Sequence, residues 1–225
     1  KQIWTTSTTI SVIIKGRTGF MRSLPLSPPK SFHTTNSHER LRNDSVIAAA
    51  ALSVPVEAAA MAQLALMASE NRAASALARD YPGGRGAAIA AMNRKAREIG
   101  MTRTTFVDGT GLSSDNVSTA QDLTKMVAAA YKYPLIRDFT TDTGLIVQGT
   151  RGRSMNYHNS NRLVGSPQWD IGLSKTGYIS EAGRCLVMQA RIDGEPISIV
   201  LLNSFGKLTP FGDSNRLRKW LLANS

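Results

Sequence analysis

The chain has 225 residues, of which 42% are hydrophobic and 19% are charged, and its formal net charge is +11. A chain of this length can bury one core and at most a small second lobe, so we expect one main domain. The strong positive charge is compatible with nucleic acid, an anionic membrane surface or an acidic polymer as partner. The basic residues are spread along the chain without an accompanying nucleic-acid-binding signature, so we expect no nucleic-acid partner.

Cysteine and histidine usage gives no sign of a metal site. The single cysteine, Cys185, excludes an internal disulfide and a cysteine-rich metal centre. Its apolar surroundings favour a small buried side chain over a reactive thiol. The histidines His33, His38 and His158 form no His-Glu-x-x-His or related motif. We therefore expect neither a metal ion nor a cofactor.

The longest apolar run, Val46 to Val56, is too short to cross a membrane and contains Pro55. It imitates a signal peptide, but its internal position and the neighbouring Asp44 argue against that interpretation. The sequence therefore predicts no transmembrane segment and no N-terminal signal peptide in this chain.

The composition changes near residue 60. Residues 1–60 are rich in Ser, Thr and Pro, and we expect a disordered or aberrant segment there, apart from a short strand from Ile10 to Ile14. Residues 61–225 show the helical and strand patterns of a folded domain. The sequence therefore predicts a boundary near residue 60.

The first part of this domain is helical. Apolar residues at helical spacing predict a first helix from Met61 up to the breaker Pro82-Gly83-Gly84, and a second from Ala87 to Ile99. A third helix begins after a cap at Ser118-Thr119, and Pro134 starts a new element.

The last third alternates between apolar strands and turns, and ends in a helix. The predicted strands are Leu145 to Val147, Ile171 to Lys175, Arg184 to Arg191 and Ile197 to Leu202. Asp193-Gly194 predicts a tight hairpin turn between the last two strands. Apolar residues on one side of Asp213 to Leu222 predict a final helix across the sheet. Together these elements predict an α+β fold, with a helical cluster packed on an antiparallel sheet and a C-terminal helix.

Two short motifs carry chemistry. Ser69-Glu70-Asn71 offers a hydroxyl and an amide on neighbouring turns, and Lys175-Thr176-Gly177 lies on a predicted strand. A strand lysine and an adjacent hydroxyl can bind a carboxylate through charge-assisted hydrogen bonds. Taken alone, each motif has a simpler interpretation, because Ser69 and Asn71 are typical of a helix terminus and Lys175 of a solvated strand.

The two motifs stand among five blocks that together resemble the low-molecular-mass penicillin-binding proteins. The blocks are Leu66 to Ala74, Phe106 to Ser113, Asn116 to Leu123, His158 to Leu163 and Lys175 to Gly183. Within that family the chain is similar to the D-alanyl-D-alanine carboxypeptidases and endopeptidases, and most to the endopeptidases of the Gram-negative periplasm. The resemblance covers about residues 61–225.

The resemblance implies a partial penicillin-binding or β-lactamase-like transpeptidase fold. It also implies a periplasmic serine hydrolase that acts on peptidoglycan stem peptides through an acyl-enzyme and is inhibited by β-lactams. By the family pattern, Ser69 and Asn71 belong to the catalytic machinery, whereas Lys175, Thr176 and Gly177 bind the substrate.

The family's remaining element is a Ser-x-x-Lys that carries the nucleophile and its base. Ser27-Pro28-Pro29-Lys30 matches the pattern, but two prolines inside one turn oppose the helix that would bring Ser27 and Lys30 together. We therefore interpret the chain as an N-terminally truncated relative without a credible nucleophile. Because no acyl-enzyme forms without that serine, the chain is predicted to be inactive.

Two other functions stay open at this point. The first is a non-catalytic muropeptide-binding protein, in which Lys175, Thr176 and Asn71 hold a D-alanyl peptide without cleaving it. The second is a basic protein that binds an anionic polymer through its net charge.

Overall fold

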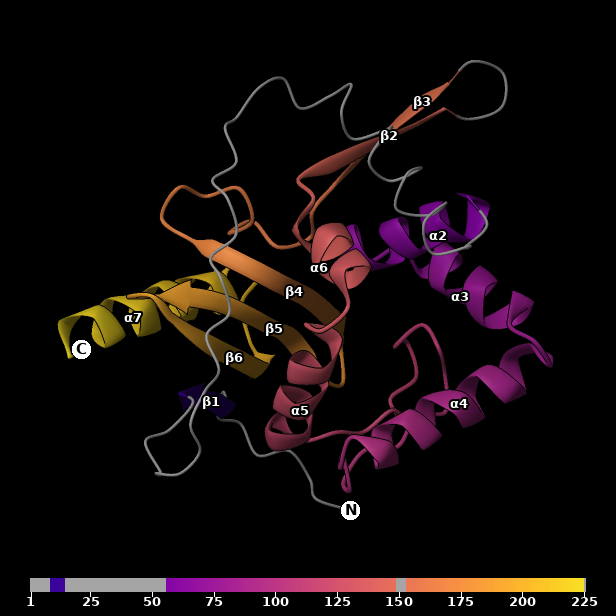
Figure 1. The fold of residues 1–225 in the computed structure, drawn as a ribbon, viewed down its shortest axis with the longest axis horizontal. Coiled ribbons are helices and arrows are strands. Elements are labelled where there is room, and N and C mark those ends of the chain that lie inside the picture. The colour runs from indigo at the N-terminus through magenta and orange to yellow at the C-terminus, as the bar shows by residue number, and fades with distance from the viewer. Residues whose placement is uncertain (1–8, 15–55, 149–152, 225) are drawn as a thin grey trace, which may run out of the picture.

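The computed structural model describes residues 9–14, 56–148 and 153–224 (Figure 1). Its elements in chain order are β1 (Thr9–Ile14), α2 (Val56–Met67), α3 (Asn71–Asp80), α4 (Gly84–Glu98), α5 (Ala120–Ala130), α6 (Pro134–Thr141), β2 (Gly144–Gln148), β3 (Ser154–His158), β4 (Asp170–Ile179), β5 (Gly183–Ile192), β6 (Glu195–Ser204) and α7 (Thr209–Ala223).

Four strands form one antiparallel sheet in the order β1-β6-β5-β4, and β2 and β3 form a separate hairpin. The β5–β6 connection is the tight turn that the sequence predicts. Asp193 has a φ of 51° and Gly194 a φ of 77°, the positive values that a two-residue hairpin turn of this kind requires. Strand β4 is the end strand of the described sheet, and it lies beside α6 (Figure 1).

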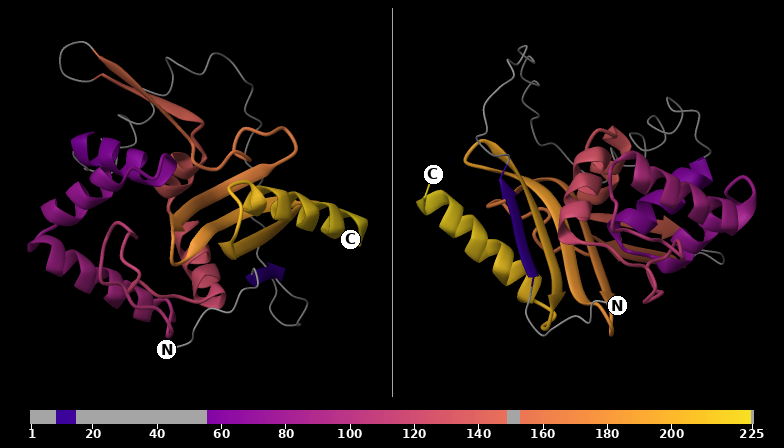
Figure 2. Two further views of the ribbon diagram at one scale, coloured as in Figure 1. Left: turned by 180° about the vertical axis from the view of Figure 1, so that it is seen from behind. Right: turned by 90° about the horizontal axis from the view of Figure 1, so that it is seen from below.

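The sheet separates two layers of helices, because alternate residues of β5 and β6 point to opposite faces. Leu186, Met188 and Ile199 pack on the face covered by α7. Val187 and Val200 pack on the other face, against α5. Figure 2 shows α7 on one side of the sheet and the remaining helices on the other.

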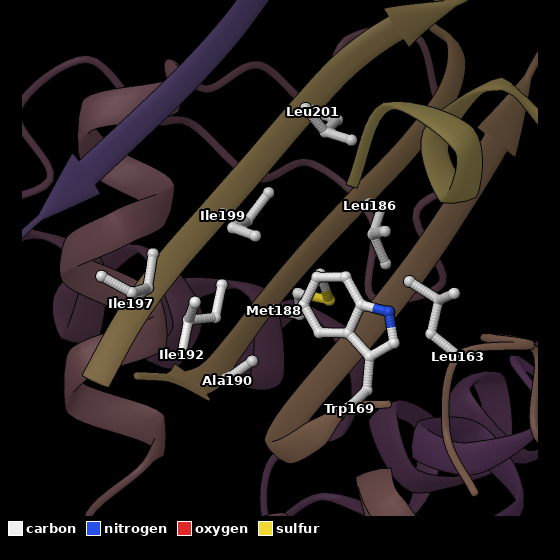
Figure 3. Close-up of a cluster of buried hydrophobic side chains, with 9 residues drawn as sticks. All are labelled: Leu163, Trp169, Leu186, Met188, Ala190, Ile192, Ile197, Ile199 and Leu201. Carbon is white, nitrogen blue, oxygen red and sulfur yellow. The ribbon is translucent and has the colours of Figure 1, made fainter. Parts of the chain in front are cut away.

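Trp169, just before β4, closes the α7 side of the core. Figure 3 shows its indole beside Met188. The Trp169 Nε1–H donates a hydrogen bond to Asn215 Oδ1 on α7, at 2.9 Å. This bond satisfies the polar atom of a large, buried side chain and ties α7 to the sheet.

The helical cluster is held together by a smaller core and by side-chain bonds to the backbone. Phe139 on α6 packs with Ala59 and Leu66 on α2. Asn93 on α4 accepts a hydrogen bond from the Phe106 N–H at 2.8 Å and donates one to the Phe106 carbonyl at 2.7 Å. The segment after α4 is therefore fixed against that helix.

The predicted α+β fold with its C-terminal helix is confirmed, and the short strand predicted near Ile10 is β1. The first predicted helix is wrong in one respect, because the chain breaks between Met67 and Asn71 into α2 and α3. The sequence does not predict strand β3, since it is only five residues long and most of its side chains are exposed.

Three further predictions fall largely on residues that the structure does not describe. These are the boundary near residue 60, the absence of a signal peptide around residues 46–55, and the improbable nucleophile pair Ser27 and Lys30. They stay predictions. Within the described residues, no helix has the length and apolar character needed to span a bilayer.

Candidate active site

The break between α2 and α3 places Ser69 at the surface of a cleft. Ser69 has a φ of 56°, in the left-handed region that side-chain-bearing residues rarely adopt. Glu70 then caps α3, because its carboxylate accepts a hydrogen bond from the Arg72 N–H at 3.0 Å. The cap starts a new helix after Ser69 and leaves the Ser69 side chain on the cleft wall.

Lys175 on β4 reaches across to this break. Its Nζ donates hydrogen bonds to Ser69 Oγ and, at 2.9 Å, to the Thr176 carbonyl oxygen. It makes no ion pair with any acidic side chain in the described part of the chain. Burial lowers the pKa of Lys175 to about 8. A desolvated ammonium without a counter-ion is a favourable partner for a carboxylate ligand.

Three hydroxyl groups join the strand to the helix break. Thr176 Oγ1 donates to Ser160 Oγ at 2.7 Å, and Ser160 Oγ donates to the Met67 carbonyl at 3.1 Å. Ser69 Oγ lies 3.4 Å from both Ser160 Oγ and Thr176 Oγ1. Ser160 thus connects β4 to the end of α2 and holds the two motifs at a fixed separation.

These groups border a cleft of about 750 Å³, which is in the range of small-molecule sites. Its apolar wall includes Leu66, Met92, Phe106 and Met126. Asn71 also lines the cleft, is exposed and makes no side-chain hydrogen bond to another described residue. A ligand in this cleft therefore meets an apolar surface and one polar edge.

The loop after Phe106 forms part of the cleft wall and is held by Asp108. The carboxylate of Asp108 accepts hydrogen bonds from the N–H groups of Thr110 and Leu112, both at 2.9 Å. Burial alone would raise the pKa of Asp108, but these bonds hold it below its usual value. Asp108 is thus an ionised anchor for its own loop.

The rim of the cleft is positive. Arg162, Arg184 and Lys207 all line it, and none of them forms an ion pair with another described residue. The two lining carboxylates are already engaged, Asp108 as above and Glu70 with the Arg72 guanidinium at 2.9 Å. The unpaired charge of the site is therefore positive, which favours an anionic ligand.

The structure brings Ser69, Lys175 and Thr176 into direct contact, and Asn71 and Gly177 line the same cleft. Ser160 was not assigned a role from sequence. It belongs to one of the five sequence blocks, but serine is common and its position gave no sign of contact with Lys175-Thr176-Gly177.

The sequence also contains a second literal Ser-x-x-Lys, Ser204-Phe205-Gly206-Lys207. It is no better candidate for a nucleophile pair. Ser204 ends β6 and Lys207 lies in the following turn, so no helix places them on one face. Ser204 Oγ is fully buried and has no hydrogen-bond partner among the described residues, so it is not open to a substrate.

Cys185 lies on β5, as the sequence predicts, but it is half-buried and lines the cleft. Burial raises the pKa of the Cys185 thiol above its usual value, so the thiol stays protonated near neutral pH. Within the described residues, no group of three or more His, Cys, Asp or Glu side chains is placed to hold a metal ion.

Comparison with known proteins places this geometry in a family. Residues 23–206 match the model of the D-alanyl-D-alanine carboxypeptidase family. The chain is 47% identical over 162 residues to a D-alanyl-D-alanine endopeptidase of Pseudomonas aeruginosa, with 72% of this chain and 52% of the relative covered. It is 48% identical, with the same coverage, to a D-alanyl-D-alanine endopeptidase of Escherichia coli K12. The chain thus spans about half the length of these relatives.

Solved structures show the same similarity. Penicillin-binding protein D2 of Listeria monocytogenes, in its cefotaxime-bound form, is 28% identical with a TM-score of 0.60, and the match covers 70% of this chain and 63% of that one. The S96A mutant of the Streptomyces K15 DD-transpeptidase is 26% identical with a TM-score of 0.66, and the match covers 74% and 68%.

Proposed function

Because the chain belongs to the D-alanyl-D-alanine carboxypeptidase family, we propose that it is the peptide-binding part of a serine-type D-alanyl-D-alanine carboxypeptidase or endopeptidase. Such an enzyme acts on peptidoglycan stem peptides through an acyl-enzyme, and its location is the periplasm. We further propose that this chain binds the peptide and does not hydrolyse it, because the Ser-x-x-Lys at Ser27 and Lys30 is a poor match to a nucleophile helix.

The contact between Lys175, Ser69 and Thr176 carries this proposal. A terminal D-alanine carboxylate placed at this contact accepts hydrogen bonds from Lys175 Nζ and Thr176 Oγ1. Each hydrogen bond to a charged group contributes about 1.5–3 kcal/mol. The ligand carboxylate also supplies the counter-ion that the desolvated ammonium lacks.

The remainder of the peptide has a natural place along β4. As the end strand of the described sheet, β4 has a row of backbone N–H and C=O groups that no other described strand pairs. An extended peptide adds to such an edge through main-chain hydrogen bonds. Gly177 has no side chain to hinder a peptide that lies beside the strand.

Ser69 and Asn71 have roles in a catalytically complete relative of this chain. Ser69 Oγ touches Lys175 Nζ and opens onto the cleft, so it can pass a proton toward the leaving amine. Asn71 offers an amide to the substrate at the same cleft wall. The attacking serine and its lysine come from a Ser-x-x-Lys helix, for which Ser27 and Lys30 are a poor match.

Calorimetric titration with an N-acetylated peptide ending in D-Ala-D-Ala, compared with its C-terminal amide, tests the proposal. We expect the free acid to bind at least tenfold more tightly, because only the acid carries the carboxylate. Lys175→Met should remove this difference, whereas the matched control Lys219→Met, on the exposed face of α7, should keep it. Equal affinity of the intact chain for acid and amide would contradict the proposed site.

Hydrolysis is measured on the same samples by chromatography of released D-alanine. We expect none, and no mass increase of the chain after incubation with a β-lactam. Release of D-alanine, or an acyl adduct, would show that the chain holds a working nucleophile.

Binding to an anionic polymer is the second candidate function, favoured by the net charge of +11 and the three unpaired cations on the rim. Titration with polyglutamate at increasing salt distinguishes it. Tight binding that survives Lys175→Met and falls steeply with salt would favour polymer binding over recognition of the D-alanyl terminus.

A further inference from the structure

Arg184 stands at one end of the cleft in contact with Tyr178. The two residues are directly opposite one another in the β4–β5 register. The guanidinium carbon of Arg184 lies 4.2 Å from the centroid of the Tyr178 ring, the arrangement of a cation–π contact. Tyr178 is 58% exposed, so the pair borders solvent and the cleft together.

The stacked ring holds the guanidinium without using its N–H donors. An Arg side chain carries five such donors in a planar fork that matches a carboxylate. The residue opposite Arg184 on β6 is Ser204, and that on β4 is Tyr178, so neither cross-strand neighbour is acidic. Arg184 makes no hydrogen bond or ion pair with another described side chain. It is an oriented cation with unused donors on the wall of a ligand-sized cleft.

The surroundings of Arg184 reinforce an anion preference. Lys207, three positions after Ser204, lines the same cleft and is exposed. The first turn of α7 follows, and its residues Pro210 and Phe211 also line the cleft. The N-terminal end of a helix carries a partial positive charge. An anionic group near Arg184 thus meets positive potential from three sources.

The spacing along β4 relates this point to the carboxylate position at Lys175 and Thr176. Tyr178 lies two residues beyond Thr176 on the same strand, a separation of about 6.8 Å. A peptide extended along β4 advances by the same distance for every two residues. With its terminal carboxylate at Thr176 and its chain antiparallel to β4, the peptide places the residue two positions earlier beside Tyr178 and Arg184.

We propose that Arg184, oriented by Tyr178, forms a second anion-binding subsite that selects peptides with a carboxylate two residues before the terminal D-alanine. The inference rests on the proposed function. It narrows the substrate class to stem peptides with a free acid at that position, and it disfavours those in which the same acid is neutralised as an amide.

Two N-acetylated tripeptides test the subsite, one with glutamate and one with glutamine before D-Ala-D-Ala. They have the same shape and differ in one charge. At low salt we expect the intact chain to bind the glutamate peptide about three- to tenfold more tightly, the range for a partly exposed charge pair. Arg184→Gln should bring the ratio of the affinities for the two tripeptides close to one, while the affinity for the glutamine peptide stays unchanged.

Arg191→Gln is the matched control, because Arg191 lies on the same strand, is exposed and is 3.9 Å from Asp170 instead of in the cleft. It should keep the glutamate preference. Tyr178→Leu is a second variant, which leaves the charge of Arg184 but removes the ring that orients it. We expect it to reduce the ratio by half or more.

Three results would overturn the subsite. The first is an affinity ratio of the two tripeptides near one in the intact chain. The others are a ratio that persists in Arg184→Gln, and equal losses of the ratio in Arg184→Gln and Arg191→Gln. Its failure is distinct from failure of the proposed function. Lys175→Met should weaken both tripeptides together and leave their ratio unchanged, whereas binding of neither tripeptide to the intact chain would overturn both proposals.

Discussion

Lys175 Nζ on β4 donates a hydrogen bond to Ser69 Oγ in the break between α2 and α3, although 106 positions separate the two residues. The contact connects the end strand of the sheet to the helical cluster. Lys175 is buried at this contact, and the burial lowers its pKa to about 8. Both the affinity for a carboxylate and the stability of the chain should therefore depend on the charge of Lys175.

Binding of a peptide with a free C-terminal carboxylate should weaken as pH rises through about 8. Below that pH Lys175 is an ammonium and pairs with the carboxylate, whereas above it the free site loses the charge. We expect a loss of up to tenfold in affinity per pH unit above 8. Calorimetry from pH 6.5 to 9.5 measures it, with the C-terminal amide as a control whose affinity should stay flat.

Between pH 7 and pH 10, the free energy of unfolding of the intact chain should rise relative to that of the Lys175→Met variant. The unfolded chain holds the Lys175 proton up to about 10.5, whereas the folded chain releases it near 8, so alkaline pH favours the folded state. At 1.36 kcal/mol per pKa unit, the gain is about 3 kcal/mol between those values. Urea unfolding of both proteins at pH 7 and pH 10 measures it. A constant difference between them would show that Lys175 is not desolvated.

Ser69→Gly should be more stable than Ser69→Ala by about 1 kcal/mol, because the backbone at this position has a φ of 56°. Both variants lose the hydroxyl, so their difference isolates the backbone. Thermal unfolding of the two proteins under one condition gives the comparison. A more stable alanine variant would indicate that the left-handed conformation is not kept in solution.

Asn93→Ala should destabilise the fold by about 1–3 kcal/mol, since it leaves the Phe106 N–H and C=O without their partners. It should also weaken peptide binding, because Phe106 belongs to the cleft wall. Gln121→Ala, an exposed position on α5, is the control and should change neither quantity by more than about 0.5 kcal/mol. Urea unfolding and calorimetry measure the two effects.

Much of the architecture could be predicted from local patterns. The turn at Asp193-Gly194, the cap at Ser118-Thr119 and the apolar strands β5 and β6 each follow from local residue types, and each appears as predicted. The class of fold follows from the order of the elements. None of these features needs information from distant parts of the chain.

The break after α2 could not be predicted in the same way. Ser69 and Asn71 are typical of a helix terminus, but they stand between two runs of strong helix formers, so the local pattern favours one continuous helix. The structure instead ends α2 at Met67, whose carbonyl accepts hydrogen bonds from the Ser160 N–H and Oγ at 3.0 and 3.1 Å. A residue 93 positions away thus supplies the partner that ends the helix, and sequence periodicity cannot detect it.

The sequence predicts only part of the candidate site, because some of its residues depend on contacts between distant segments. Ser69, Lys175 and Thr176 belong to motifs, so the sequence alone indicates them as site residues. Arg184 and Ser160 have no motif of their own, and their importance depends on what lies opposite them across strands. Arg184 became a candidate only when the strand register placed it beside Tyr178.

The long separation between Ser69 and its partners also bears on how the chain folds. Contacts with Ser160 and Lys175 close loops of 91 and 106 positions, so they form only after distant parts of the chain have come together. A partly folded chain with intact helices and an intact β5–β6 hairpin would still have no carboxylate site. Ligand binding by this chain is therefore a direct measure of its native population, and a saturating peptide should raise its melting temperature.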